Sequence, residues 1–328
     1  MAYIKLDFEA LRHNVKLIEQ RSGARFAAVL KDNAYGHGLM EIAQALSEWG
    51  IKRAVVRDSK EAKKIEKLFS YILVLADTPK DDGFFYAIND LQALKEASQK
   101  ALLELKVDTG MHRNGIGMDE LQEALEIVIQ RGLNLAGVFT HFRSADELGS
   151  ELFWQMKNWE HIKREVKKWA SQKNYPLPHF HSANSAALFR AGIPKDEFAR
   201  VGIALYGYIE YDRLFSQPPL RPVLSLWARR IATRKLLTGQ RVGYGGVFEA
   251  PEAMEVSTYD VGYADGIFRA LKMTKDGKIL GRVSMDSIVL EGSKEEVCIF
   301  DDAKEVAKEL GTISYEVLVK LSLALPRQ

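Results

Sequence analysis

Short apolar runs alternate with amphipathic stretches from residue 9 to about residue 210. Eight of these runs have the composition of strands that are buried on both faces of a parallel sheet. They are Ala27–Leu30, Ala54–Val56, Tyr71–Leu75, Phe84–Ile88, Leu102–Val107, Leu135–Thr140, Pro178–His181 and Phe198–Ala204. Helical spacing of apolar residues lies between them, in Glu9–Arg21, in Met40–Trp49, at Leu121, Leu125 and Val128, and in Trp154–Trp169. The pattern predicts an α/β fold with an N-terminal (β/α)8 TIM-type barrel, although a doubly wound sheet shares the alternation.

The pattern changes after Tyr211. Prolines in Gln217–Pro222 are typical of a linker, because proline disrupts both helices and strand ladders. Mainly β structure is then predicted by runs rich in β-branched and aromatic residues, at Val223–Leu237, Val256–Val261 and Ser287–Leu290. A short helix is expected at Ala303–Leu310, and Ala2–Asp7 alternates like a strand that can pair with this region. We therefore expect a barrel domain over residues 1–214 and a C-terminal β domain over residues 215–328.

Composition narrows the class of protein. A chain of 328 residues with 47% hydrophobic and 27% charged residues is typical of a globular protein. The net charge of +2 and the absence of a dense basic block give no reason to expect nucleic acid as a partner. No apolar run suits a signal peptide or a membrane span, so a soluble, cytoplasmic protein is expected. The single cysteine, Cys298, excludes an intramolecular disulfide, and its apolar neighbours indicate a buried small residue rather than a nucleophile.

Lys31 is the most unusual polar residue of the barrel half. It follows the first apolar run directly and precedes a turn rich in Asn, Tyr, Gly and His. Desolvation beside apolar surface makes a neutral amine accessible, and a neutral amine can form a Schiff base with an aldehyde cofactor. A lysine that extends from a strand end into solvent is the structural alternative.

Further polar and glycine residues follow the later strands, where a barrel gathers its active-site groups. They are Arg113, His141, Asn184, Ser185, Arg200, Gly202 and Ile203. The loops after strands seven and eight commonly bind phosphate, and Ser185 with the backbone N–H groups of Gly202 and Ile203 suits that role. Each residue also has a structural alternative, such as a helix cap for Ser185, a surface ion pair for Arg200 or a core histidine for His141. Their joint arrival at one end of one barrel favours a site.

Motifs along nearly the whole chain resemble those of the alanine racemases. The segment Lys31–Gly38, which reads K-D-N-A-Y-G-H-G, is similar to the cofactor-lysine motif of that family. The other similar segments are Asp108–Arg113, Thr140–Phe142, His181–Ala187, Arg200–Gly207, Gly243–Gly245, Val261–Gly266, Gly281–Asp286 and Tyr315–Glu316. They occur in the family's order, which makes the resemblance highly specific.

The resemblance implies a barrel followed by a β domain, pyridoxal 5'-phosphate as cofactor, a small amino-acid substrate and a homodimer with shared active sites. It implies a racemase that interconverts L- and D-alanine through a pyridoxal-phosphate aldimine with two opposite-face bases. Inversion needs one group on each face of Cα, and the resemblance assigns these roles to Lys31 and to Tyr263 of the partner subunit. A phenol is a poor base unless its pKa is lowered, and His141 is implied to polarise Tyr263.

The resemblance also implies roles for the remaining residues. Arg200 faces the pyridine nitrogen and, being protonated, leaves that nitrogen unprotonated. Arg113 and the backbone at Met285 bind the substrate carboxylate, and Lys106 matches a position where a carbamylated lysine braces this arginine. The implied cofactor contacts are Lys31, Tyr35, His141, Asn184, Ser185, Arg200, Gly202, Ile203 and Tyr315. Tyr244 lines the entrance, Asp286 has a supporting role and no metal is implied.

Two departures from the family pattern affect specificity rather than chemistry. Ser287 follows Asp286 where glutamine is usual, and Phe142-Arg143 replaces a smaller pair. A serine or broad-specificity racemase therefore stays open. A fold-related decarboxylase of basic amino acids would need a carboxylate at the ring nitrogen and a cysteine near the active site, and Arg200 and the position of Cys298 argue against it. Non-catalytic cofactor-binding proteins resemble only the barrel half, so the second domain with Tyr263 argues against that class.

Overall fold

The computed structural model describes residues 1–328, and the eight predicted strands form a closed parallel barrel. Pairing runs in chain order from the first strand, and the last strand pairs back onto the first. The barrel strands are β2 (Phe26–Val29), β3 (Arg53–Val56), β4 (Tyr71–Val74), β5 (Phe85–Ile88), β6 (Leu102–Asp108), β8 (Asn134–Phe139), β9 (His179–His181) and β10 (Glu197–Val201). Every residue of β2 and of β4 is buried, which explains their unbroken apolar sequences. The closed barrel excludes the doubly wound alternative.

The main boundary difference concerns the eighth strand, which ends at Val201 and not at residue 204. Residues 202–204 form a tight turn, in which the backbone N–H groups of Leu205 and Tyr206 bond the carbonyls of Gly202 and Ile203 at 2.9 and 3.1 Å. The turn lets backbone N–H groups face the end of the barrel instead of pairing in the sheet. A short strand, β7 (Ile116–Gly117), also pairs with β6 and was not predicted.

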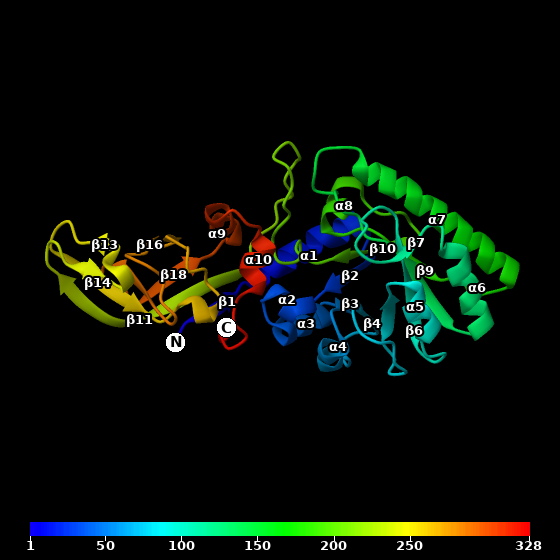
Figure 1. The fold of residues 1–328 in the computed structure, drawn as a ribbon, viewed down its shortest axis with the longest axis horizontal. Coiled ribbons are helices and arrows are strands. Elements are labelled where there is room, and N and C mark those ends of the chain that lie inside the picture. The colour runs from blue at the N-terminus through cyan, green and yellow to red at the C-terminus, as the bar shows by residue number, and fades with distance from the viewer.

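Helices surround the barrel (Figure 1). They are α1 (Phe8–Ser22), α2 (Lys31–Tyr35), α3 (Leu39–Glu48), α4 (Ser59–Ile65), α5 (Leu91–Glu96), α6 (Leu121–Arg131), α7 (Glu151–Lys173) and α8 (Ser185–Ala191). Helix α1 begins where the Asp7 carboxylate accepts from Ala10 N–H and ends at Gly23 in the left-handed conformation. None of the helices combines the length and the apolar composition that a membrane crossing requires.

The C-terminal arm (residues 223–328) is mainly β and extends away from the barrel in Figure 1. Its longest strand, β11 (Leu224–Leu236), pairs with β1 (Tyr3–Leu6), which confirms the predicted return of the N-terminal strand. The other strands are β12 (Arg241–Val242), β13 (Phe248–Glu249), β14 (Met254–Tyr259), β15 (Met273–Thr274), β16 (Gly277–Lys278), β17 (Ile288–Glu291) and β18 (Glu296–Phe300). Helix α9 (Ala303–Leu310) has the predicted bounds.

The short strands β12, β13, β15 and β16, strand β18 and helix α10 (Ser314–Val319) were not predicted, and α10 reaches the barrel. Strand β18 contains Cys298, so the expectation of a buried cysteine is confirmed, and burial raises the pKa of its thiol to about 12. Helix α10 follows α9 and packs against α2 of the barrel, as Figure 1 shows. The end of the chain therefore contacts the segment that carries Lys31.

Candidate active site

Lys31 lies at the carboxyl end of β2, where it begins the short helix α2 and is half-buried. The backbone from Asp32 to Tyr35 has φ values of 52–55°, a left-handed path that only a tightly packed turn can hold. Gly36 continues the turn with φ 81°, and a Cβ there would lie 2.1 Å from the carbonyl oxygen of Leu318 in α10. The glycine in the motif is thus required by the close contact between this turn and the end of the chain.

The predicted phosphate contacts come together at one rim of the barrel. The rings of Tyr35 and Tyr315 lie 5.9 Å apart, which brings α10 of the arm to α2. The Ser185 hydroxyl accepts from the backbone N–H groups of Gly202 at 3.2 Å and Ala204 at 3.4 Å. A Cβ on Gly202 would lie 2.5 Å from the Tyr35 hydroxyl oxygen, so the glycine lets that hydroxyl approach the turn. The Tyr35 hydroxyl makes no hydrogen bond within the chain and is free to bind an anion.

Asn184 caps helix α8 directly beside this rim. Its side-chain oxygen accepts from Ala187 N–H at 2.9 Å and its amide donates to the Phe142 carbonyl at 3.0 Å. The helix-cap role considered for Ser185 therefore belongs to Asn184, and Ser185 instead bonds the turn after β10. Asn184 also ties the loop after β8 to the loop after β9.

His141 lies just past the end of β8, 3.3 Å from an Arg200 nitrogen. Burial lowers the pKa of His141 well below its usual value, and the nearby charges of Arg200, Lys106, Arg113 and Lys31 lower it further. The pKa of Lys106 is lowered to about 8 by burial and by the charges of Arg113 and Arg200. So much positive charge in a partly buried space favours an anionic ligand, because each cation destabilises its neighbours until a counter-charge is present.

Arg200 is the most deeply embedded of these cations, with 6% of its surface exposed. Its guanidinium donates to the carbonyls of Thr140 at 2.6 Å and His181 at 3.1 Å, and lies 2.7 Å from His181 Nδ1. Burial lowers the pKa of the guanidinium to about 10, which still leaves it protonated at neutral pH. Arg200 is therefore a charged donor at all its contacts and has no carboxylate as a direct partner.

Lys106 and Arg113 are close but not bonded to each other. Lys106 Nζ donates to the side-chain oxygen of Asn114, and the Arg113 side chain is exposed and makes no hydrogen bond or ion pair. The amine of Lys106 repels Arg113 as it stands. A bracing contact of the kind implied by the resemblance requires a negative group on Lys106.

Among the predicted residues of the arm, Tyr315 reaches the rim of the barrel, and the other four lie on segments between strands of the β domain. The turn of Tyr263 and the turn of Met285 are joined by hydrogen bonds from Tyr263 N–H to the Ser284 carbonyl at 3.1 Å and from Ala264 N–H to the Met285 carbonyl at 3.0 Å. The side chains of Tyr263, Met285 and Tyr244 are 42%, 54% and 73% exposed, and Asp286 is exposed as well. None of these four side chains forms a hydrogen bond or ion pair with a barrel residue.

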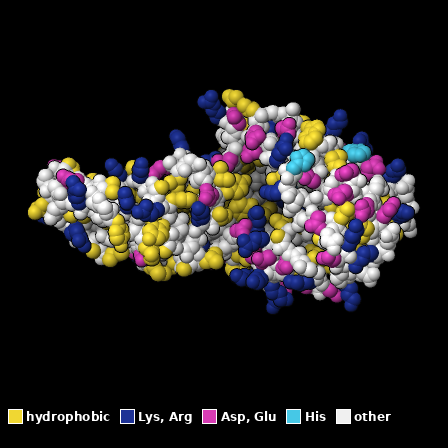
Figure 2. All heavy atoms as spheres, in the orientation of Figure 1, with side chains coloured by type: hydrophobic (Ala, Val, Ile, Leu, Met, Phe, Trp, Pro, Cys, Tyr) yellow, Lys and Arg dark blue, Asp and Glu magenta, His cyan; other side chains and the backbone are white.

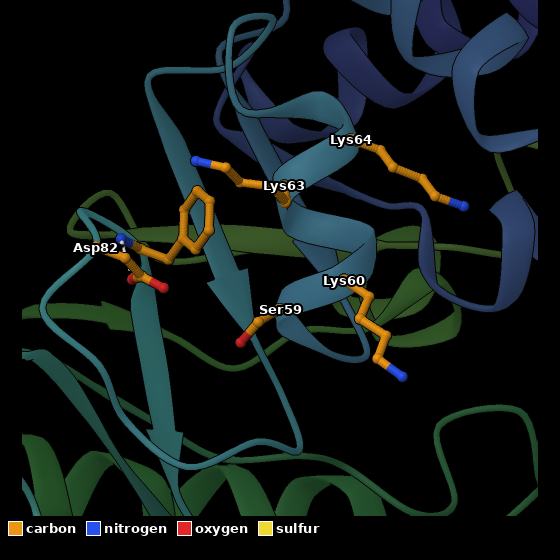
Figure 3. Close-up of a pocket in the computed structure, with 6 residues that line it drawn as sticks. Ser59, Lys60, Lys63, Lys64 and Asp82 are labelled. Atoms are coloured by element: carbon orange, nitrogen blue, oxygen red, sulfur yellow. Dashed lines mark hydrogen bonds between the residues drawn. The ribbon is translucent and has the colours of Figure 1, made fainter.

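A separate hollow of about 630 Å³ lies on the outer side of the barrel, lined by Ser59, Lys60, Lys63, Lys64, Asp82 and Phe84. Figure 3 shows the three ammonium groups pointing in different directions, so they do not converge on a ligand. Lys63 is already paired with Glu66 at 2.6 Å. This surface does not belong to the site at Lys31.

Sequence reasoning missed several buried polar residues in and around the barrel. The Tyr206 hydroxyl donates to the Val29 carbonyl at 3.0 Å, and the Tyr206 ring lies 5.1 Å from that of Tyr35. Glu104 lies wholly buried between strands, bonded to two histidines. A charged residue in the apolar run of β6, facing a His-x-His pair on β9, was the available signal, since residues two apart share one face of a strand.

Comparison with known proteins agrees with the geometry over the full chain. The family model for the alanine racemase N-terminal domain matches residues 6–210, and the model for the C-terminal domain matches residues 223–328. The chain belongs to the alanine racemase family. An alanine racemase of Nitratiruptor sp. is 58% identical over 329 residues, covering 100% of this chain and 99% of that protein.

Solved structures of the alanine racemase family have the same fold. The alanine racemase of Clostridium difficile superposes with a TM-score of 0.88 at 26% identity, covering 99% of this chain and 94% of that one. The alanine racemase of Bartonella henselae, whose structure contains covalently bound pyridoxal phosphate, superposes with a TM-score of 0.81 at 24% identity and covers 100% of this chain and 99% of that one. Alanine racemases as a family depend on pyridoxal phosphate.

The residues present fit pyridoxal phosphate. The rim of Tyr35, Ser185 and Gly202 offers hydroxyl and backbone donors, with space that a single Cβ on Gly202 would fill. The cations around His141 can balance the negative charge of the phosphate and the phenolic oxygen. Lys31 offers a primary amine at the strand end between these features. The family expectation and the chemistry of the site agree.

Proposed function

We propose that the protein interconverts L-alanine and D-alanine, with pyridoxal 5'-phosphate held on Lys31 and with Tyr263 of a partner subunit as the second base. The observation that carries the proposal is the position of Lys31 at the carboxyl end of β2, the same end of the barrel at which Arg200 lies 3.3 Å from His141. Full-length membership of the alanine racemase family supports the reaction.

Bound pyridoxal phosphate supplies the electron-withdrawing system that weakens the Cα–H bond of the attached amino acid. The residues of this chain then have separate tasks. Tyr35, Ser185, Gly202, Ile203 and Tyr315 bind the phosphate, and Asn184 holds the two loops that carry this rim. His141 lies beside Arg200 and faces the interior of the site.

Arg200 sets the reactivity of the site at the pyridine nitrogen. A guanidinium donates hydrogen bonds and cannot accept a proton, so it keeps the ring nitrogen unprotonated. The cofactor is then a weaker electron sink, which favours return of the proton over side reactions. Arg113 is exposed on the loop after β6 and orients the phenolic oxygen and the substrate carboxylate, which the Met285 backbone also contacts.

Proton transfer requires a base on each face of Cα. Lys31 Nζ removes or delivers the proton on one face, and the Tyr263 hydroxyl acts on the other. The Tyr263 side chain is 42% exposed and its hydroxyl has no hydrogen-bond partner in its own chain, and we infer that it acts on a second copy. We therefore propose a homodimer in which the β domain, residues 215–328, completes the site of the partner's barrel domain, residues 1–214.

Exposed apolar side chains on the arm support association. Ile231, Leu237 and Val247 are 60–64% exposed, in the same region as Tyr244 and Met285. Figure 2 shows hydrophobic side chains along the arm and in the recess between the arm and the barrel. Exposed apolar side chains that gather on one surface are typical of interaction sites.

A borohydride experiment tests the cofactor site. Reduction of protein loaded with pyridoxal phosphate should fix the cofactor to Lys31, as found by peptide mapping. Lys31→Ala should lose the adduct, whereas Lys60→Ala, on the surface helix α4, should keep it. An adduct on another lysine would contradict the proposal. Chiral separation of products across the amino acids measures whether alanine, serine or a wider set is used.

A further inference from the structure

Glu104 lies in the barrel interior below Arg200, and none of its surface is exposed. Its carboxylate accepts three hydrogen bonds, from the Tyr71 hydroxyl at 2.6 Å, from His179 Nε2 at 2.8 Å and from His181 Nε2 at 2.6 Å. Burial alone would raise the pKa of Glu104, but the contacts with His181 and His179 outweigh burial and lower it. Glu104 is therefore a buried carboxylate that stays ionised.

The neighbouring strand leaves room for this cluster. Gly137 of β8 lies in register between Glu104 of β6 and His179 of β9. A Cβ on Gly137 would lie 2.5 Å from His179 Nε2 and 3.0 Å from the Glu104 carboxyl carbon. A side chain on β8 would thus break the contact, and the glycine permits a direct bond across the strand.

His181 connects this carboxylate to Arg200. Its Nδ1 lies 2.7 Å from an Arg200 nitrogen, and a guanidinium offers only donors. Nδ1 must therefore be unprotonated, and the ring proton must be on Nε2, which faces Glu104. The ring lies between Phe139 and Phe198, with centroids at 4.7 and 4.6 Å, so it cannot turn over to exchange its nitrogens. The two histidine Nε2 atoms lie 2.8 and 2.6 Å from carboxylate oxygens of Glu104, which are hydrogen-bonding distances.

We propose that Glu104 is a positioning residue for catalysis, which locks His181 in the Nε2–H tautomer and thereby holds Arg200 in its place facing the cofactor. An acceptor at Nδ1 stabilises one orientation of the guanidinium, and a carboxylate is the group that keeps the proton on the opposite nitrogen. The part of this inference that concerns the pyridine nitrogen rests on the proposed function. The part that concerns the tautomer does not.

Nitrogen NMR of the protein labelled with 15N-histidine tests the tautomer without any substitution. In both cofactor-free and loaded protein, His181 should be protonated at Nε2 and unprotonated at Nδ1 from pH 5 to pH 8. Burial, with the charge of Arg200, lowers the pKa of His181 to about 3, so the imidazolium form should be absent over this range. A proton on Nδ1, or an imidazolium at pH 6, would overturn the inference.

Glu104→Gln tests the link to Arg200. A glutamine amide has one acceptor oxygen for three donors, and its NH2 group forces a neighbouring histidine to accept. His181 Nδ1 should then carry a proton towards Arg200 and repel it. We expect kcat to fall about 10- to 100-fold with little change in KM, and the pH titration of the bound cofactor's absorbance to shift.

Tyr71→Phe is the matched control. It removes one hydrogen bond from the same carboxylate but leaves the bond to His181, so both kcat and the absorbance titration should stay within about twofold of the original. Equal effects of the two substitutions would mean that Glu104 is merely structural. A Glu104→Gln protein in which the His181 tautomer and the cofactor's absorbance titration are unchanged would also overturn the inference. The borohydride adduct on Lys31 tests the proposed function separately. If Glu104→Gln does not fold, the NMR result on the original chain remains decisive.

Discussion

The barrel and the C-terminal arm differ in how far their proposed functional side chains are buried and hydrogen-bonded. In the barrel, Arg200 is 6% exposed, and every hydrogen bond of its guanidinium goes to a carbonyl oxygen or an imidazole nitrogen. In the arm, Tyr263 is 42% exposed and Met285 is 54% exposed, and neither side chain has a hydrogen-bond partner. All seven histidines also lie in the first 181 residues, so the buried imidazoles belong to the barrel half alone.

This difference in burial fits different roles for the two regions in the proposed reaction. A site that must hold a charged cofactor in one orientation needs buried, hydrogen-bonded side chains on rigid strands. A group that must act on the opposite face of the substrate cannot come from the same barrel floor, and its exposure in one chain is what a shared site requires. Under the proposed function, Tyr263 and Met285 of the arm act only on association, whereas Arg200 is already held in place within one chain.

Tyr263→Phe should have the largest effect and tests the arm alone. The substitution removes the hydroxyl and keeps the ring, so the fold should survive, and racemisation in both directions should fall about 100- to 10,000-fold. Lys31 still acts on its own face, which the family resemblance assigns to the D-enantiomer. Solvent-deuterium exchange into recovered substrate should therefore persist for D-alanine and vanish for L-alanine. Equal loss from both enantiomers would show that Tyr263 is not the opposite-face base.

Mixing two inactive variants tests whether the halves come from different chains. Lys31→Ala removes the base of the barrel and Tyr263→Phe removes the base of the arm, so each homodimer should be inactive. A mixed dimer has one site with both defects and one intact site. Random exchange of subunits should restore roughly a quarter of the original activity, measured after joint refolding. Activity that stays absent after mixing, with mixed dimers present by mass spectrometry, would place both residues in one chain's site.

Acid should destabilise the barrel before the arm. Burial lowers the pKa of His37 to about 4 and that of His181 to about 3, both below the value of about 6.5 in an unfolded chain. At a pH between the folded-state and unfolded-state pKa values, these histidines bind more protons in the unfolded chain than in the folded one. Their contribution to the free energy of unfolding is therefore complete above pH 6.5 and is lost as the pH falls towards 4. The loss from His37 alone is of order 3 kcal/mol.

Urea unfolding at a series of pH values measures this loss, with signals from each half of the chain. His37→Asn keeps a donor towards the carbonyls of Ala34 and Tyr35 and should flatten the dependence on pH. His161→Gln, on the exposed side of α7, is the control for replacing one histidine and should not flatten it. A barrel that keeps its full stability at pH 4 would contradict the neutral state of the buried imidazoles.

The smallest expected effects come from two tyrosines of the barrel half, one proposed to bind the cofactor and one that stabilises the fold. Tyr35→Phe removes a hydroxyl that has no partner in the chain and should weaken pyridoxal-phosphate binding about tenfold with little loss of stability. Tyr206→Phe removes a buried hydroxyl bonded to the Val29 carbonyl at 3.0 Å. It should cost about 1 kcal/mol of stability and leave cofactor affinity nearly unchanged. Fluorescence titration with the cofactor and thermal melting distinguish the two, and identical behaviour would show that Tyr35 packs rather than binds.

The sequence pattern by itself was enough for the eight strands, the position of Lys31 at a strand end, helix α9 and the return of β1 to the second sheet, whereas the doubly wound alternative was excluded only by the closed barrel. The spacing of apolar residues and the composition of each run predict these features, because buried parallel strands are apolar throughout and helical faces repeat every 3.6 residues. Motif resemblance then supplied the family. The end of β10 was placed too late, because Gly202–Ala204 is as apolar as the strand it follows and only its turn hydrogen bonds distinguish it.

Only the tertiary structure decided which polar residues meet. Glu104 and His181 are far apart in the chain, and nothing local in either segment says that they bond or that Gly137 makes room between them. The same holds for α10, whose contact with α2 brings Tyr315 to Tyr35 across most of the chain. Local patterns determine which elements form and which face is buried. Contacts between distant elements depend on barrel closure and strand register, and these are set by the packing of the whole molecule.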